Sequence, residues 1–241
     1  MLSINNAHER DQNISFKENG HIYNVKGMSH FTSVTTWVKR KFEKFDADKI
    51  IDNMMKSKNW DTSKYFGMTK SEIKESWNKN RDTAASNGTN MHKMFEDYYN
   101  NEPMYYYNTE SVEYIYFSDF IKEHSHLKPY RTEWMIYDEK MKIAGSIDMV
   151  YLNEDGTLSI YDWKRCKSID KTSPYNKFSI DLKYNYIPDT NYWHYALQLN
   201  MYKTILEKNY GFVVSELYLV GIHNELHTTY KKIKVPILNI V

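Results

Sequence analysis

Large apolar residues recur along much of the chain at intervals of three and four, the spacing of a helix with one buried face. Residues 82–100 show it most clearly, at Met91, Met94, Phe95 and Tyr98. A second helix is expected over residues 191–211, ending at Gly211, because glycine readily takes the left-handed conformation that closes a helix. Further helices are expected over 111–123 and over 46–80, the latter broken near Gly67.

Gly88 lies inside the helix expected at 82–100. Glycine costs about 1 kcal/mol relative to alanine in a helix interior. Its position therefore predicts that another part of the backbone approaches closely at Gly88.

Alternating or continuous apolar runs, bounded by turn residues, predict strands. Three follow one another over residues 130–137, 141–152 and 158–166, and a fourth covers 214–223. Near the N-terminus, residues 14–27 predict a hairpin that turns at Asn19-Gly20. A helix is expected next, capped by Ser33 or Thr35, with an apolar face made of Trp37, Val38, Phe42 and Phe45.

The order of these elements predicts an α/β (α+β) fold. From residue 81 onward the order is helix, helix, three strands, helix and strand, which indicates a central mixed sheet flanked by helices. No linker separates the first 80 residues from the rest. Residues 1–80 are therefore expected to form a hairpin and helical extension packed on a core of residues 81–241.

Composition excludes several classes of protein. The 241 residues carry 32 Lys and Arg against 31 Asp and Glu, so any basic surface for nucleic acid must be local. Cys166 is the single cysteine, which excludes an internal disulfide and any four-cysteine zinc or iron–sulfur site. No apolar run reaches the roughly 18 to 20 residues of a membrane span, and no signal peptide is recognisable. We expect a soluble intracellular protein of the cytoplasm, nucleus or a viral factory.

Two aspartates and a lysine stand out in the second and third expected strands. If Glu154-Asp155-Gly156 forms a three-residue loop, with Gly156 in the left-handed conformation, Asp148 lies directly opposite Asp162. Lys164, two residues further, then shares their face of the sheet. A two-residue turn would instead pair Asp148 with Trp163 and send the aspartates to opposite faces.

Two carboxylates at such a distance repel each other unless a cation lies between them. Hard oxygen ligands suit Mg²⁺ or Mn²⁺, and Lys164 could stabilise phosphate charge or hold the attacking water. The pattern thus indicates metal-dependent phosphodiester chemistry. The alternative is a surface hairpin with a solvated Asp–Lys face, against which stand the apolar residues around the charges.

Four short motifs in this order resemble the PD-(D/E)XK nuclease superfamily in its RecB-like exonuclease branch: "SVTT", "GTNMHKMFE", "GSIDMV" with "IYDWK", and "QLNMY". They span residues 33–202 and are similar to motifs of mitochondrial genome-maintenance exonucleases and related phage and large-virus proteins. The resemblance implies a restriction-endonuclease-like core and a Mg²⁺- or Mn²⁺-dependent deoxyribonuclease. RecB-like nucleases of the CRISPR-adaptation type carry a four-cysteine iron–sulfur cluster, which one cysteine cannot support.

The resemblance also implies roles for individual residues. The metal ligands would be His92, Asp148, Asp162 and the backbone carbonyl of Trp163. Lys164 would be the catalytic lysine, Gln198 and Tyr202 would line the site and touch DNA or the reacting phosphate, and Glu133 would be a supporting acid. Glu96, one helical turn beyond His92, would orient the imidazole.

A basic, aromatic segment follows the "SVTT" motif and has two readings. Trp37, Lys39, Arg40 and Lys41 would form a rim for single-stranded nucleic acid, or equally a solvated helix face. The preferred function is a DNA exonuclease acting on single strands or DNA ends in replication, recombination or repair. The alternative is a catalytically inactive module of the same fold that binds nucleic acid or a partner. The sequence leaves polarity, strandedness, DNA against RNA, endonuclease action and oligomeric state open.

Overall fold

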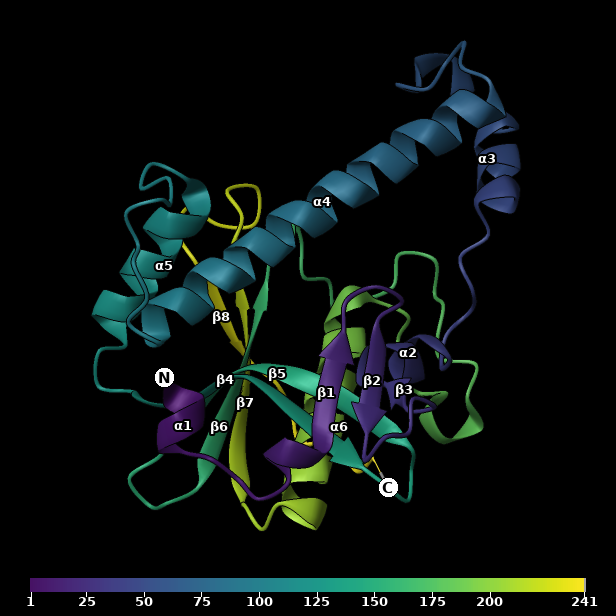
Figure 1. The fold of residues 1–241 in the computed structure, drawn as a ribbon. Helices are drawn as coiled ribbons and strands as arrows, with labels where there is room; N and C mark the ends of the chain where they lie inside the picture. Colours follow the sequence, from purple (N-terminus) through teal and green to yellow (C-terminus); the bar gives the residue numbers. More distant parts are fainter. Residues whose placement is uncertain (241) are drawn as a thin grey trace.

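A six-stranded mixed sheet forms the centre of the protein in the computed structural model, which describes residues 1–240 (Figure 1). Its strands are β3 (Thr32–Ser33), β4 (Lys128–Asp138), β5 (Ile143–Leu152), β6 (Leu158–Lys164), β7 (Val214–Gly221) and β8 (Lys231–Lys234). β4, β5 and β6 pair antiparallel, β7 runs parallel to β6, and β8 closes the edge antiparallel to β7.

The two edges of strand β5 are paired to different extents. β4 pairs with β5 along one edge over its whole length. On the other edge β3 pairs with Ile143 and Ala144, whereas β6 pairs only from Met149 to Leu152. The middle of that edge, from Gly145 to Asp148, is therefore left as a fork between β3 and β6.

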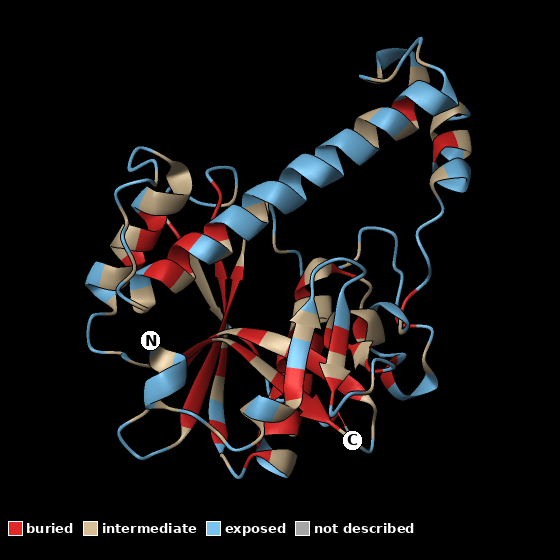
Figure 2. Cartoon of the chain, in the orientation of Figure 1, coloured by how far each residue is buried: buried red, intermediate tan, exposed pale blue. Residues whose placement is uncertain are grey.

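Helices cover both faces of the sheet. On one face, α2 (Val34–Lys39) and α6 (Asn191–Asn209) pack on β4, β5 and β7 in the larger apolar cluster. On the other, the end of α4 (Lys70–Tyr99) and α5 (Val112–Glu123) enclose a second cluster with Trp163 at its centre. Buried residues concentrate in the sheet and on these helix faces (Figure 2). This burial is the main source of stability, at about 25 cal/mol per Å² of apolar surface.

Smaller elements complete the N-terminal region. α1 (Leu2–Asn5) lies against β4, and the hairpin of β1 (Ile14–Lys17) and β2 (Ile22–Val25) packs beside β3 and β4. The hairpin prediction is confirmed, since Lys17 pairs with Ile22 around the turn that contains Asn19-Gly20.

The mixed α/β architecture predicted from the sequence is confirmed, with differences of detail. The helix expected from residue 82 begins at Lys70, where Thr69 and Glu72 form a capping box. The division expected at residue 80 consequently falls inside α4. α2 ends at Lys39, so Phe42 and Phe45 lie beyond it, Phe42 buried and Phe45 exposed.

The middle of α4 packs against nothing. All ten residues of the segment 78–87 are exposed, and the helix projects away from the sheet to a small lobe that includes α3 (Ala47–Met55) (Figure 1). The lobe buries Ile51 and Ile73. The expected close approach at Gly88 is wrong, because no atom from outside the adjoining turns of α4 lies within 4 Å of a Cβ placed there. Among the helices of residues 1–240, none combines the length and apolar content needed to cross a membrane.

Candidate metal centre

The loop between β5 and β6 sets which residues meet at the fork. Gly156 has φ of +81°, its amide donates to the carbonyl of Asn153 (3.0 Å), and the amide of Asn153 donates to the carbonyl of Thr157 (2.8 Å). The loop therefore has three residues, as one of the two predicted registers required. The paired residues run from Leu152↔Leu158 to Met149↔Tyr161, which places Asp148 opposite Asp162.

At Asp148 the backbone ladder between β5 and β6 stops. The carboxylate of Asp148 takes over as acceptor, receiving the backbone amide of Trp163 at 2.8 Å. The indole of Trp163 points to the opposite side, into the cluster with Phe95 and Phe117. The predicted arrangement, with both aspartates and Lys164 on one face and Trp163 on the other, is confirmed.

Glu133 on β4 faces Asp148 and has an unusual backbone. Its φ of +42° is the only left-handed value inside a strand of residues 1–240. Thr132 pairs with Met149, and Trp134 pairs with Ile147. Met149 and Ile147 are two positions apart and would point to the same face in a regular strand, but they belong to the apolar clusters on opposite faces of the sheet. The alternation of side chains thus reverses at this point. Such backbone strain in a non-glycine residue costs of order 1–3 kcal/mol and is concentrated at functional sites.

His92 reaches the fork from α4. Its Nε2 lies 3.0 Å from the carbonyl oxygen of Trp163, and its Nδ1 lies 3.4 Å from Oε1 of Glu133 and 3.7 Å from Oδ2 of Asp148. One donor atom from each of His92, Glu133 and Asp148 lies within 4.8 Å of the others, so the three could hold a metal ion. Two carboxylates, an imidazole and a nearby carbonyl suit Mg²⁺ or Mn²⁺ by chemistry.

Charge at the fork shifts the pKa values of these groups. Burial works to lower the pKa of His92, but the charge of Asp148 and the hydrogen bond to Glu133 raise it to about 9. Burial raises the pKa of Asp148, against the opposing charges of His92 and Lys164. A protonated His92 therefore neutralises the carboxylates in the place where a cation would.

Asp162 is engaged by a different set of partners. Its Oδ2 lies 2.7 Å from Nζ of Lys164, and its Oδ1 accepts from Nε2 of Gln198 at 3.1 Å. Burial raises the pKa of Asp162 to about 7, with Lys164 opposing the shift. Burial also opposes the charge on Lys164, but Asp162 and Asp148 raise the pKa of the lysine above its usual value. Asp162 thus holds Lys164 in place and is outside the group of three that converges on one point.

Gln198 and Tyr202 lie one turn apart on α6, and the tyrosine hydroxyl accepts from Gln198 at 3.2 Å. Tyr202 also fills the space beside Gly145 in the fork. A Cβ added at Gly145 would lie 2.7 Å from Cε1 of Tyr202 and 3.1 Å from Cγ2 of Val34. Glycine at this position is what lets α6 approach β5.

Gly145→Ala is expected to destabilise the protein by about 1–3 kcal/mol, as overpacking does in a filled core. It should also displace Tyr202 and with it Gln198. Gly88→Ala is the matched control, because open space surrounds Gly88 and the change should stabilise α4 by up to about 1 kcal/mol. Thermal unfolding of both variants checks the opposite signs, and equal effects would show that the fork is not tightly packed.

The remaining residues singled out from sequence lie away from the centre. Glu96 faces Lys93 at 3.4 Å and has no hydrogen bond to His92 within residues 1–240, so Glu133 is the acid that orients the imidazole. Lys41 pairs with Asp181 at 2.6 Å and lies over the ring of Trp37. These two are therefore largely committed to packing.

Lys39 and Arg40 are exposed at the end of α2 and remain available to an anionic partner.

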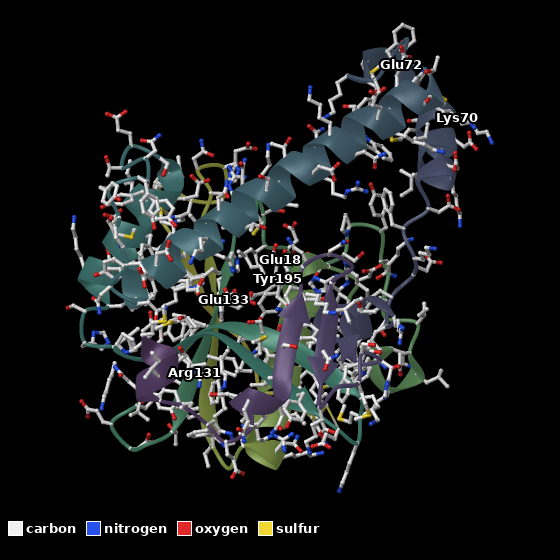
Figure 3. All side chains as sticks on the ribbon, in the orientation of Figure 1. Glu18, Lys70, Glu72, Arg131, Glu133 and Tyr195 are labelled. Atoms are coloured by element: carbon white, nitrogen blue, oxygen red, sulfur yellow. The ribbon has the colours of Figure 1, made fainter. Side chains whose placement is uncertain are left out.

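Two tyrosines of the site were not found from the sequence. Tyr23 comes from the N-terminal hairpin, and its pKa is raised to about 12 by burial and by the charges of Glu133 and Asp148. Tyr195, labelled in Figure 3, lies on α6 one turn before Gln198. Its ring centroid lies 5.0 Å from the ammonium of Lys164. The spacing of Tyr195 and Gln198 was a readable signal, whereas nothing in the sequence linked Tyr23 to residues more than a hundred positions away.

The arrangement can bind a divalent cation beside a fixed ammonium, which is the combination needed to act on a phosphate ester. No family model matches the chain, and no curated protein is significantly similar to it. The chemistry of the site therefore rests on its own geometry.

Proposed function

We propose that the protein is a Mg²⁺- or Mn²⁺-dependent deoxyribonuclease that hydrolyses phosphodiester bonds in single-stranded DNA or at DNA ends. The observation that carries the proposal is the convergence of His92, Glu133 and Asp148 within 4.8 Å of one another, next to Lys164. The choice of DNA rests on the motifs that resemble RecB-like exonucleases of the PD-(D/E)XK superfamily.

Each residue has a task that follows from its position. His92, Glu133 and Asp148, with the carbonyl of Trp163, would hold the ion. When bound, the ion would supply Lewis acidity, activating water and neutralising phosphate charge.

Lys164, fixed by Asp162, presents its ammonium to the same phosphate and stabilises the charge that develops there. Gln198 donates to the other oxygen of Asp162, so the carboxylate that positions the lysine is itself held in place. The ring of Tyr195 beside the ammonium further restricts its motion.

A second candidate is a catalytically inactive nucleic-acid- or partner-binding module. The observation in its favour is the direct Asp162–Lys164 ion pair, which already satisfies both charges without a metal. Cleavage of end-labelled single- and double-stranded DNA with Mn²⁺, abolished by EDTA, supports the nuclease. Binding without cleavage at any metal concentration supports the module.

Metal affinity separates the three convergent residues from Asp162. Glu133→Gln and Asp148→Asn are each expected to weaken Mn²⁺ binding by about tenfold or more, as loss of a ligand or its close support does. Asp162→Asn should weaken it less, because that carboxylate holds Lys164. Titration by calorimetry or Mn²⁺ electron paramagnetic resonance measures all three. An equal loss in Asp162→Asn would show that Asp162 is also a metal ligand, as inferred from sequence.

A further inference from the structure

A cavity of about 390 Å³ adjoins the metal centre on the β4 side. Glu133 belongs to its wall, and from there the cavity extends past Arg131 to α1. Figure 3 shows Glu133 near the middle of the molecule and Arg131 closer to α1. The volume lies in the range of pockets that hold a small organic molecule.

The charges of the cavity wall favour a neutral occupant. Arg131 pairs with Asp11 at 2.7 Å, and Lys93 pairs with Asp97 at 2.6 Å. Glu102 also lines the cavity and has no ion pair within residues 1–240. Five carboxylates line the cavity, against the cations of Lys93, Arg131 and the Met1 amino group, so a phosphate in this space would enter a net negative field. Like charges brought together cost several kcal/mol.

The wall nevertheless has one charged group with free donors. Arg131 is 5% exposed, and its Nη1 donates to the carbonyl of Asn6 and to Asp11. Nε is buried and out of reach of the cavity, whereas no hydrogen bond from Nη2 is found within residues 1–240, so Nη2 is the donor left for an occupant. An arginine in this state can donate to acceptor atoms on the edge of a nucleobase.

Apolar and aromatic groups complete the wall. Ile14 and Met135 contribute apolar surface, and Tyr106, at the rim, is 56% exposed. Aromatic rings of this kind stack on bases at about 1–3 kcal/mol per base. The lining thus offers stacking, apolar contact and a hydrogen-bond donor, and rejects anions.

We propose that this cavity receives the terminal nucleoside of the DNA strand, carrying a free hydroxyl rather than a phosphate. The inference rests on the proposed function, because it is the phosphodiester next to that nucleoside that would lie at His92, Glu133 and Asp148. With this site the protein would be an exonuclease that releases one nucleotide at a time and prefers strands whose end carries a hydroxyl.

Cleavage of matched oligodeoxynucleotides with a hydroxyl or a phosphate at either end tests the charge argument. At the end that is attacked, the hydroxyl form should be cut about tenfold faster, equivalent to 1.4 kcal/mol. Glu102→Gln should reduce this preference, whereas Glu110→Gln, in the exposed part of the same loop, should not. A phosphate-ended strand cut as fast as the hydroxyl form, or faster, would overturn the inference.

A second arm does not depend on catalysis. Ser3 on α1 lines the cavity and is exposed, while its neighbour Ile4 is 73% exposed and lies outside it. Ser3→Trp should fill the cavity and abolish the saturation-transfer NMR signal of deoxyguanosine, and Ile4→Trp should retain it. Equal signals in the two variants, or none with the unmodified protein, would overturn the nucleoside site. A protein that binds deoxyguanosine in this way but cuts no DNA keeps the site and loses the proposed function.

Discussion

Asp148→Asn and Lys164→Met are each expected to reduce DNA cleavage by on the order of 10²- to 10³-fold, the effect of removing a preorganised charge from a reacting phosphate. Asp148 is one of the three residues that converge at the fork, and Lys164 is the ammonium fixed beside them. Initial rates on end-labelled DNA at saturating Mn²⁺ measure the loss. Asp155→Asn and Lys167→Met are matched controls at exposed positions and should keep full activity.

Lys164→Met carries a second consequence that separates catalysis from folding. Breaking a buried ion pair by removing one partner costs about 3–5 kcal/mol. Here the loss should be smaller, because Asp162 already has a pKa near 7 and can take up a proton. The double variant Asp162→Asn with Lys164→Met should regain stability without regaining cleavage. Recovery of activity in the double variant would show that Lys164 acts only through folding.

The metal-free protein is expected to lose about 2 kcal/mol of stability between pH 7 and pH 9 through His92 alone. The pKa of His92 is raised from 6.5 to about 9 on folding, so its stabilising effect is complete below pH 6.5 and disappears as the pH rises through 9. Asp162, with a pKa raised from 3.8 to about 7, gives a similar fall mostly below pH 7, so a comparison with a His92 variant assigns the fall above pH 7 to His92. The loss corresponds to a decrease in Tm of roughly 4–8 °C for a chain of this size.

Thermal unfolding in EDTA at pH 7, 8 and 9 measures this decrease. His92→Gln should flatten the profile, while His126→Gln, at an exposed position, should leave it unchanged. Mn²⁺ should reverse the slope, because the ion binds neutral imidazole and protons compete with it less as the pH rises. A profile that is flat without metal would mean that His92 is not held between the carboxylates.

The strand register was readable from sequence because it depends on local chemistry. Gly156 takes the left-handed position of a three-residue loop, and counting back from the loop brings Asp148 opposite Asp162. The capping box of Thr69 and Glu72 was equally local and could have located the start of α4. Short strands such as β3 and β8 have too few residues to show a period.

Which side chains contact one another within the site could not be predicted from local sequence in the same way. Glu133 joins the group of three residues that could hold a metal ion where its backbone is left-handed inside a strand, and no residue pattern predicts that conformation. A shift of a few ångströms in the position of the Asp162 carboxylate decides whether it contacts a metal or Lys164. Tyr23 reaches the site only through the packing of the hairpin beside β3 and β4.

The unpacked middle of α4 should tolerate changes of sequence more easily than changes of length. No side chain of residues 78–87 is buried, so helix-forming substitutions there should be nearly neutral. Length is another matter, because the lobe at the tip is joined to the core twice, through α4 and through residues 40–46. Each added residue would raise the lobe by 1.5 Å and turn it by about 100°. Related chains should therefore vary freely in amino-acid sequence along this part of the helix. They should lengthen it only by nearly whole turns, together with a longer segment in place of residues 40–46.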